Sequence, residues 1–196
     1  MPCPALIDRL SLQACLSLAR TCGSEVPVGA LVRCNATRRV LATAANSALR
    51  LGSALAHAEM LALAAAQRAL PSARLDGCTL YVSLEPCLMC LGAALASRVS
   101  RVVFASRSPK YGALSSGGLQ LDHGAAPARA GGAPACAACA AAPPPAWLRA
   151  SPVRMQVACA EDAPALEGCA RQSSALLGAF FAARRREKLA AQALAR

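Results

Sequence analysis

Two stretches of the sequence organise the whole chain: His57-Ala58-Glu59 and, further along, Pro86-Cys87-Leu88-Met89-Cys90. One imidazole and two thiols can hold a zinc ion and leave its fourth position open, which is the ligand count of a catalytic zinc site. Structural zinc sites are usually closed by four protein ligands. The acidic residue beside the histidine suits proton transfer better than metal binding. The pattern therefore predicts a catalytic zinc centre held by one histidine and two cysteines.

The two cysteines are predicted to lie where a strand is followed by a helix. Residues 78–84 contain β-branched and aromatic side chains and are expected to form the strand. Pro86 suits a helix start, since its fixed φ is helical and its missing N–H costs nothing there. Cys87 and Cys90 are three apart and would share one face of that helix. The positive end of the helix should favour their thiolates.

The histidine is predicted to lie at the start of another helix. Residues 55–70 are rich in Ala and Leu and are expected to form it, with Ser53 as its N-cap. His57 and Glu59 are two apart, on nearly opposite sides of a helix. They converge only near its N-terminus, because side chains there tilt back past the end. We therefore expect two helix starts to face one metal ion.

Each half of this pattern is unspecific on its own, because a lone Cys-x-x-Cys can be a redox pair or part of another metal site. The non-functional alternative is a buried histidine with two cysteines that pack as small apolar side chains. The metal interpretation is preferred because the chain has only two histidines and one of them falls in the pattern.

Length and composition restrict the class of protein. A chain of 196 residues can form one domain with a sizeable core. Lys and Arg number 21 against 10 Asp and Glu, a net charge of +11, which suggests a polyanionic partner such as RNA. The alternative is that these charges form a basic surface that contacts only solvent and binds no polyanion. The 11 cysteines are odd in number and scattered, which favours a reducing compartment over a disulfide scaffold.

Neither export nor membrane insertion is expected. Asp8 and Arg9 interrupt the apolar start, and no basic segment precedes it, so a secretory signal is not indicated. The mean hydropathy is +0.39, and residues 130–148 carry no charge. Glycines and prolines break that run, which a lipid-exposed helix would not readily tolerate.

Helices and strands are predicted to alternate along the chain, which indicates a three-layer α/β/α domain around one mixed five-stranded sheet. The first helix is expected over residues 5–21, because Leu6, Leu10, Ala14, Leu16 and Leu18 follow a roughly helical rhythm. The other expected elements are strands at 28–32, 40–45, 101–105 and 153–158, a long loop at 106–122, and a long helix from Pro164 onward.

Residues 123–147 are dominated by Ala, Gly, Pro and Cys and show little periodicity. We expect an insertion without fixed structure within a single domain spanning 1–196. His123, Cys136 and Cys139, with Cys159, could form a second zinc site. The low-complexity alternative is preferred, because this Cys-x-x-Cys lacks a strand or helix-start context.

The chain resembles bacterial and plastid-type tRNA adenosine deaminases, zinc enzymes of the cytidine-deaminase-like fold. The similarity covers nearly the whole chain outside residues 123–147. The matching stretches are Glu25-Val26-Pro27-Val28-Gly29-Ala30, Asn46, His57-Ala58-Glu59-Met60, residues 79–90, Arg101-Val102-Val103-Phe104, Lys110, Gly112-Ala113, and Leu176-Leu177 with Phe180-Phe181 before an arginine run.

This resemblance implies hydrolytic deamination of the wobble adenosine of a tRNA anticodon to inosine, with one zinc ion per chain. The implied zinc ligands are His57, Cys87 and Cys90, and the implied proton shuttle is Glu59. The implied substrate-binding residues are Asn46, Val28, Ala58 and Lys110. Candidate contacts to the RNA are Arg107, Ser108, Arg184, Arg185 and Arg186. A homodimer that binds the tRNA anticodon stem-loop is also expected from the resemblance.

Two departures from the family pattern stand near the site. Ser53-Ala54-Leu55 occupy the place of an Asp-Pro-Thr run, so the helix start has less electrostatic support. Ser108 stands where an acid is common, which affects contacts to RNA beside the target rather than the chemistry.

Two other function classes stay open. One is a deaminase of small molecules such as cytosine, guanine or a pterin precursor, which shares the zinc motif. The other is a non-catalytic RNA-binding partner that keeps zinc for folding, although such a protein would not need Glu59. The expected location is the cytoplasm for a bacterial protein, or the chloroplast stroma for a plastid one.

Overall fold

The computed structural model describes residues 3–115 and 155–194. Its five strands form one mixed sheet in the order β2-β1-β3-β4-β5. Strand β1 runs antiparallel to both β2 and β3, whereas β3, β4 and β5 are parallel. The elements are α1 (Pro4–Arg20), β1 (Gly29–Cys34), β2 (Val40–Ala45), α2 (Ala58–Arg68), β3 (Cys78–Leu84), α3 (Leu88–Ala96), β4 (Arg101–Ser106), β5 (Gln156–Cys159), the short 3₁₀ helix η2 (Ala160–Asp162) and α5 (Glu167–Leu194).

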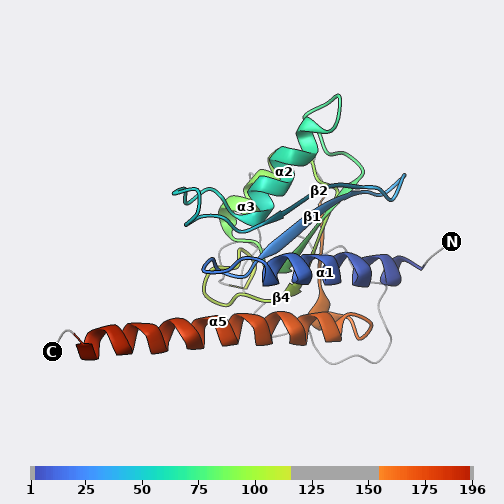
Figure 1. The fold of residues 1–196 in the computed structure, drawn as a ribbon. Coiled ribbons are helices and arrows are strands. Elements are labelled where there is room, and N and C mark those ends of the chain that lie inside the picture. Colours follow the sequence, from blue (N-terminus) through green and yellow to red (C-terminus); the bar gives the residue numbers. More distant parts are fainter. Residues whose placement is uncertain (1–2, 116–154, 195–196) are drawn as a thin grey trace.

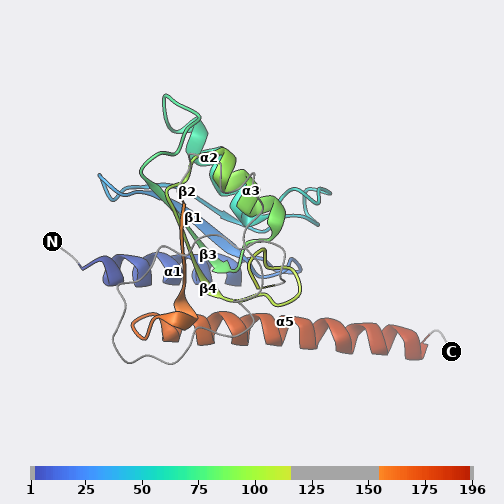
Figure 2. The ribbon, with the colours of Figure 1, turned by 180° about the vertical axis from the view of Figure 1, so that it is seen from behind.

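Helices cover both faces of this sheet. Helices α2 and α3 lie side by side on one face, and α1 and α5 lie on the other (Figures 1 and 2). The predicted three-layer α/β/α fold with a mixed five-stranded sheet is therefore confirmed. None of the helices in the described part of the chain has the length and hydropathy needed to cross a bilayer.

The layer formed by α2 rests on small side chains. Ala58, Ala62 and Ala66 are four residues apart, share one face of the helix, and are fully buried. Alanine has the highest helix propensity and lets the helix axis approach the sheet closely. Leu63 on α2 and Leu91 on α3 add larger apolar groups to the same core.

The opposite layer packs α1 closely against β1. A Cβ atom on Gly29 would stand 2.2 Å from the backbone oxygen of Cys15, so this strand position admits only glycine. Cys15 and Leu16 are fully buried here. The predicted apolar periodicity of α1 was wrong at Leu10, whose side chain is 53% exposed. Asp8 is buried instead, because Arg101 and Tyr81 donate hydrogen bonds to its carboxylate.

The helix that carries the histidine begins later than predicted. It starts at Ala58 rather than at residue 55, and its N-cap is His57, with no side-chain cap. Ser53 is not the cap: its hydroxyl accepts a hydrogen bond from the Leu55 amide within a separate turn. The backbone amide of Ala56 also bonds to the Ser53 carbonyl, so residues 53–56 are fixed as a turn before the helix starts.

The other strand predictions agree with the observed strands to within a few residues. Strand β2 coincides with its prediction, and β5 ends one residue beyond the predicted 158. Helix α5 begins three residues after Pro164. The 123–147 insertion and the proposed ligands His123, Cys136 and Cys139 lie outside the described residues, as does the end of the 106–122 loop after Ser115.

Candidate active site

Two helix N-termini meet at the site. His57 is the N-cap residue of α2 and Cys87 is the N-cap residue of α3, and both have extended backbone conformations. Neither side chain caps its own helix, so both are directed elsewhere. The carbonyl of each still accepts the first helical hydrogen bond, from Leu61 and Leu91 respectively.

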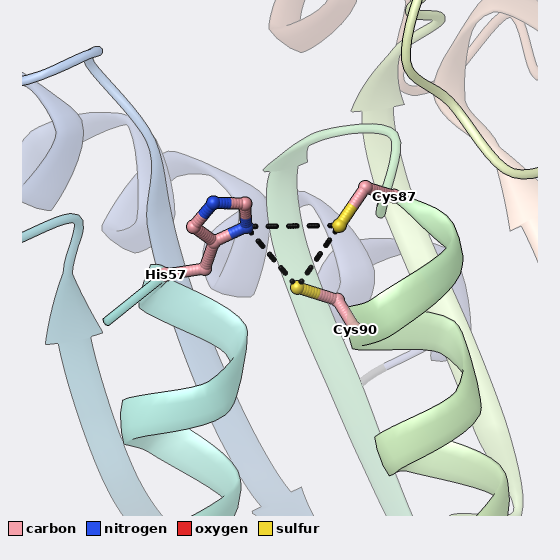
Figure 3. Close-up of side chains that lie close together, drawn as sticks. All are labelled: His57, Cys87 and Cys90. Atoms are coloured by element: carbon pink, nitrogen blue, oxygen red, sulfur yellow. Dashed lines mark hydrogen bonds between the residues drawn. The ribbon is translucent and has the colours of Figure 1, made fainter. Parts of the chain in front are cut away.

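Figure 3 shows His57 facing the two cysteine thiols across the gap between α2 and α3. The His57 Nδ1 atom lies 3.6 Å from Cys87 Sγ and 3.4 Å from Cys90 Sγ, and the two sulfur atoms are 3.5 Å apart. Zinc bonds of about 2.3 Å to sulfur and about 2.0 Å to nitrogen, at tetrahedral angles, imply ligand separations of about 3.5–3.8 Å. The observed triangle therefore fits three protein ligands of one zinc ion.

The two thiols differ in acidity. The hydrogen bond between the Cys87 and Cys90 thiols, followed by smaller contributions from the backbone and His57, lowers the pKa of Cys87 to about 5. The same bond and burial raise the pKa of Cys90. The pair thus resembles one thiolate and one thiol, and binding a metal would displace the remaining proton.

Glu59 lies within the first turn of α2 and is 4% exposed. Burial is the largest influence on its carboxyl and raises its pKa above the ordinary value. Within the described residues, the group of potential ligands whose atoms lie within 4.8 Å of one another consists of His57, Cys87 and Cys90, without Glu59. A buried carboxyl with a raised pKa, beside a metal site, suits proton transfer.

Asn46 and Val28 lie next to each other at the ends of β2 and β1. The backbone amide of Asn46 donates a 2.8 Å hydrogen bond to the carbonyl of Val28, and both residues are almost completely buried. Asn46 borders a pocket of about 630 Å³. The pocket is lined by Thr21, Cys22, Ser24, Glu25, Ala45, Asn46, Ser47, Leu49 and Arg50.

One wall of this pocket is fixed by Glu25. Its carboxylate accepts hydrogen bonds from the backbone amides of Leu49 (3.0 Å) and Arg50 (2.7 Å). Burial alone would raise the pKa of Glu25, but these two bonds and the charge of Arg50 outweigh it and lower the pKa. The carboxylate thereby holds the loop that follows Asn46.

Lys110, predicted to bind substrate, and the predicted RNA-contacting residues fall into two groups. Ser108 and Lys110 lie in the loop after β4, and Gly112 of this loop forms a bridge with Cys87. Arg107 at its start pairs with Asp162 (2.7 Å) and approaches Glu161 (3.7 Å). The exposed cations Arg184, Arg185 and Arg186 belong to the half of α5 that extends beyond the sheet (Figure 1).

Comparison with known proteins agrees with this site. Residues 7–106, half of the chain, match the family described as cytidine and deoxycytidylate deaminase zinc-binding region. The chain belongs to this deaminase family. Family membership and the ligand triangle together support a zinc-binding site at His57, Cys87 and Cys90.

Two curated relatives carry names that refer to tRNA. The chain is 48% identical over 88 residues to the tRNA-specific adenosine deaminase of Bacillus subtilis, a match covering 45% of this chain and 53% of the relative. It is 44% identical over 113 residues to the tRNA(Ile)-lysidine synthase of Deinococcus deserti, covering 57% of this chain and 21% of the relative. The chain thus spans about half or less of the length of these relatives.

Two solved structures extend the comparison. One, described as a study of A-to-I editing by tRNA:A34 deaminases at the wobble position of transfer RNA, has a TM-score of 0.51 and 37% identity. That match covers 54% of this chain and 81% of the other. A guanine deaminase from Nitrosomonas europaea has a TM-score of 0.59 at 24% identity and shares the fold. The match covers 93% of this chain and 86% of the other.

Two buried carboxylates beside the site, Glu25 and Glu85, were not among the residues predicted from the sequence. Both lay within stretches noted only for their family resemblance. Each accepts backbone hydrogen bonds from a loop beside the site. A usable signal was present for Glu85, since it is an acidic residue between an apolar strand and a metal-binding cysteine.

Proposed function

We propose that this chain catalyses the zinc-dependent, hydrolytic deamination of adenosine to inosine at the wobble position of tRNA anticodons. The observation that carries the proposal is the triangle of one imidazole nitrogen and two sulfurs, 3.4–3.6 Å apart, with a buried carboxyl beside it. The names of the relatives supply the substrate: a tRNA-specific adenosine deaminase and a structural study of tRNA:A34 deaminases.

His57, Cys87 and Cys90 would hold one zinc ion per chain. When bound, zinc lowers the pKa of a coordinated water and so provides a hydrolytic nucleophile at neutral pH. The three protein ligands leave room for that water, as expected of a catalytic rather than a structural site. The helix N-termini at His57 and Cys87 add positive potential beside the thiolates.

Glu59 would move the protons. It would accept one proton from the attacking water and deliver it to the ring nitrogen of adenine, and would then take the remaining hydroxyl proton and pass it to the departing amine as the carbonyl forms. Water and adenosine are thereby converted to inosine and ammonia. Burial, which raises the pKa of Glu59 toward the working pH, suits a group that must both accept and donate.

Asn46, Val28 and Ala58 would position the base. The Asn46 side chain can both donate and accept hydrogen bonds to a purine edge. Val28 would offer an apolar surface for the ring, and Ala58 lies between the proposed zinc ligand His57 and the proposed proton shuttle Glu59 in the sequence. These roles follow the family resemblance, and the burial of Val28 and Asn46 beside one another is consistent with them.

The rest of the tRNA would be bound outside the metal site. Lys110 and the three arginines of α5 are exposed cations that could neutralise backbone phosphates. We also propose a homodimer, which rests on the family resemblance. Sedimentation at micromolar concentration tests it: a fully active monomer would contradict the dimer without affecting the proposed reaction.

The decisive experiment incubates purified, zinc-loaded protein with total tRNA and sequences the product for adenosine-to-inosine changes. The proposal predicts conversion confined to wobble adenosines, released ammonia in equal amount, and conversion at least about 10²-fold slower with the Glu59→Gln variant. Parallel assays with free guanine, cytosine and adenosine test the small-molecule alternative. Faster turnover of a free base than of tRNA would contradict the proposal.

A further inference from the structure

The carboxylate of Glu85 connects two parts of the chain that border the metal site. It is 4% exposed and lies directly after β3, two residues before Cys87. Its Oε2 atom accepts hydrogen bonds from the Ser108 amide (2.8 Å) and the Ser115 hydroxyl (2.5 Å). Its Oε1 atom accepts hydrogen bonds from the amides of Leu114 (2.9 Å) and Ser115 (2.7 Å).

These four bonds close a loop. Ser108 and Ser115 are the two ends of an eight-residue segment, and a single carboxylate binds both. Inside the loop, a Cβ atom on Gly112 would stand 2.2 Å from the carboxyl carbon of Glu85, so glycine is required for close packing. The Gly112 amide also donates a 2.7 Å bond to the Ser108 carbonyl.

The closed loop is attached to the metal-binding segment on one side and exposed on the other. Gly112 forms an isolated antiparallel β-bridge with Cys87, and the Ala113 amide donates a 2.9 Å hydrogen bond to the Pro86 carbonyl. At the exposed side, Tyr111 is 66% accessible and the Lys110 ammonium lies 4.9 Å from the centre of its ring. Cationic side chains bind RNA phosphates, and aromatic side chains stack on RNA bases.

We propose that Glu85 is a positioning residue for the substrate: it holds residues 108–115 closed beside the metal site, so that Lys110 and Tyr111 are presented to the nucleotides flanking the target. This inference rests on the proposed RNA substrate. Glu85 itself contacts neither zinc nor RNA in this scheme. Its effect is on the conformation of the loop and therefore on substrate binding.

The variant Glu85→Gln tests this with little change in volume. An amide offers one acceptor oxygen in place of two, and its NH₂ group must face two of the former donors. The Ser115 hydroxyl can accept a hydrogen bond, whereas the Ser108 amide cannot. Both donors at Oε1 are backbone amides, so the NH₂ group should take the place of Oε2, where the Ser115 hydroxyl can accept from it. The Ser108 amide then faces an N–H group, loses its acceptor, and that end of the loop should be released.

The first readout is independent of activity. Limited trypsin digestion, followed by mass spectrometry, measures cleavage of the Lys110–Tyr111 bond. Losing hydrogen bonds to a buried charged acceptor should raise that cleavage rate about tenfold or more in Glu85→Gln. Zinc content should stay at the wild-type level. Ser115→Ala, which removes only the 2.5 Å bond, should show a smaller increase and serves if Glu85→Gln folds poorly.

The second readout is kinetic, on an anticodon stem-loop. The proposal expects KM to rise about tenfold in Glu85→Gln while kcat changes less than about threefold. Asp76→Asn, which removes the same charge from an exposed ion pair with Arg74, is the matched control and should leave cleavage and KM unchanged.

The outcomes are distinguishable. Unchanged cleavage at Lys110 in both loop variants overturns the proposal, and so does faster cleavage that is accompanied only by a loss of kcat with unchanged KM. A wild-type protein that does not deaminate RNA contradicts the proposed function instead. In that case the cleavage rate at Lys110 still decides whether Glu85 holds the loop.

Discussion

His57 and Cys87 occupy equivalent positions, each as the extended N-cap residue of its helix, and neither caps that helix with its side chain. The usual cap residues turn their side chains back to the backbone amides of the first turn. Here the two side chains instead face each other between α2 and α3, with 3.6 Å between His57 Nδ1 and Cys87 Sγ. The geometry explains how two motifs thirty residues apart form one site.

Removing one ligand should remove the metal. Cys90→Ala should lower bound zinc from about one per chain to almost none, and should reduce the melting temperature because metal binding is coupled to folding. Elemental analysis and thermal unfolding measure both effects. Cys3→Ala, which changes an exposed cysteine, is the control and should keep its zinc. Two zinc ions per wild-type chain would instead support a second site.

Glu59→Gln should separate metal binding from catalysis. It removes the proton shuttle but keeps the size of the side chain, so zinc content and tRNA binding should persist. Turnover should fall by about 10²–10⁴-fold or more, since one group serves several proton transfers. Single-turnover assays on the stem-loop measure the loss. A variant with more than about a tenth of wild-type turnover would exclude Glu59 from this role.

The ion pair between Asp8 on α1 and Arg101 on β4 should stabilise the fold without affecting the chemistry. Both guanidinium-to-carboxylate distances are 2.8 Å, and the Asp8 side chain is 9% exposed. Asp8→Asn should lower the free energy of unfolding by about 2–3 kcal/mol, because it leaves a partly buried charge unpaired. Denaturant titration measures this. Arg74→Ala, from an exposed pair, should cost at most about 1 kcal/mol.

Alkaline pH should weaken the same region through Tyr81. Burial, followed by the hydrogen bond to Asp8, raises the pKa of Tyr81 from 10.0 to about 12. The folded state therefore keeps this proton longer than the unfolded state does. The resulting stability is present below pH 10 and is lost as the pH rises through about 12.

Comparing wild type with Tyr81→Phe isolates this contribution, since the buried thiols are common to both proteins. The difference in unfolding free energy should shrink by roughly 1 kcal/mol between about pH 8 and about pH 11. A difference that stays constant over this range would show that Tyr81 titrates normally in the folded protein.

The distal part of α5 should contribute to RNA affinity. Replacing Arg184, Arg185 and Arg186 with Gln should raise KM for tRNA and make the dependence of log affinity on log salt shallower, by roughly 0.7–0.9 per lost phosphate contact. Zinc content and turnover at saturating stem-loop should not change. Unchanged KM and salt dependence would identify these arginines as a solvated surface only.

The candidate ligand set and most of the architecture could be predicted from the sequence. His57, Cys87 and Cys90 were recognisable because zinc accepts few residue types at few spacings. The strands and helices were recognisable because their apolar patterns repeat over short distances, so β2 and β3 coincide with their predictions.

The roles of the buried polar residues depend on the tertiary structure. Leu10 fits a helical rhythm yet is exposed, whereas Asp8 is buried because Arg101, 93 residues away, neutralises it. Likewise Glu85 has the role of a loop anchor only because Ser108 and Ser115 are folded back onto it. A buried charge depends on partners distant in the chain, and local sequence patterns contain no information about such partners.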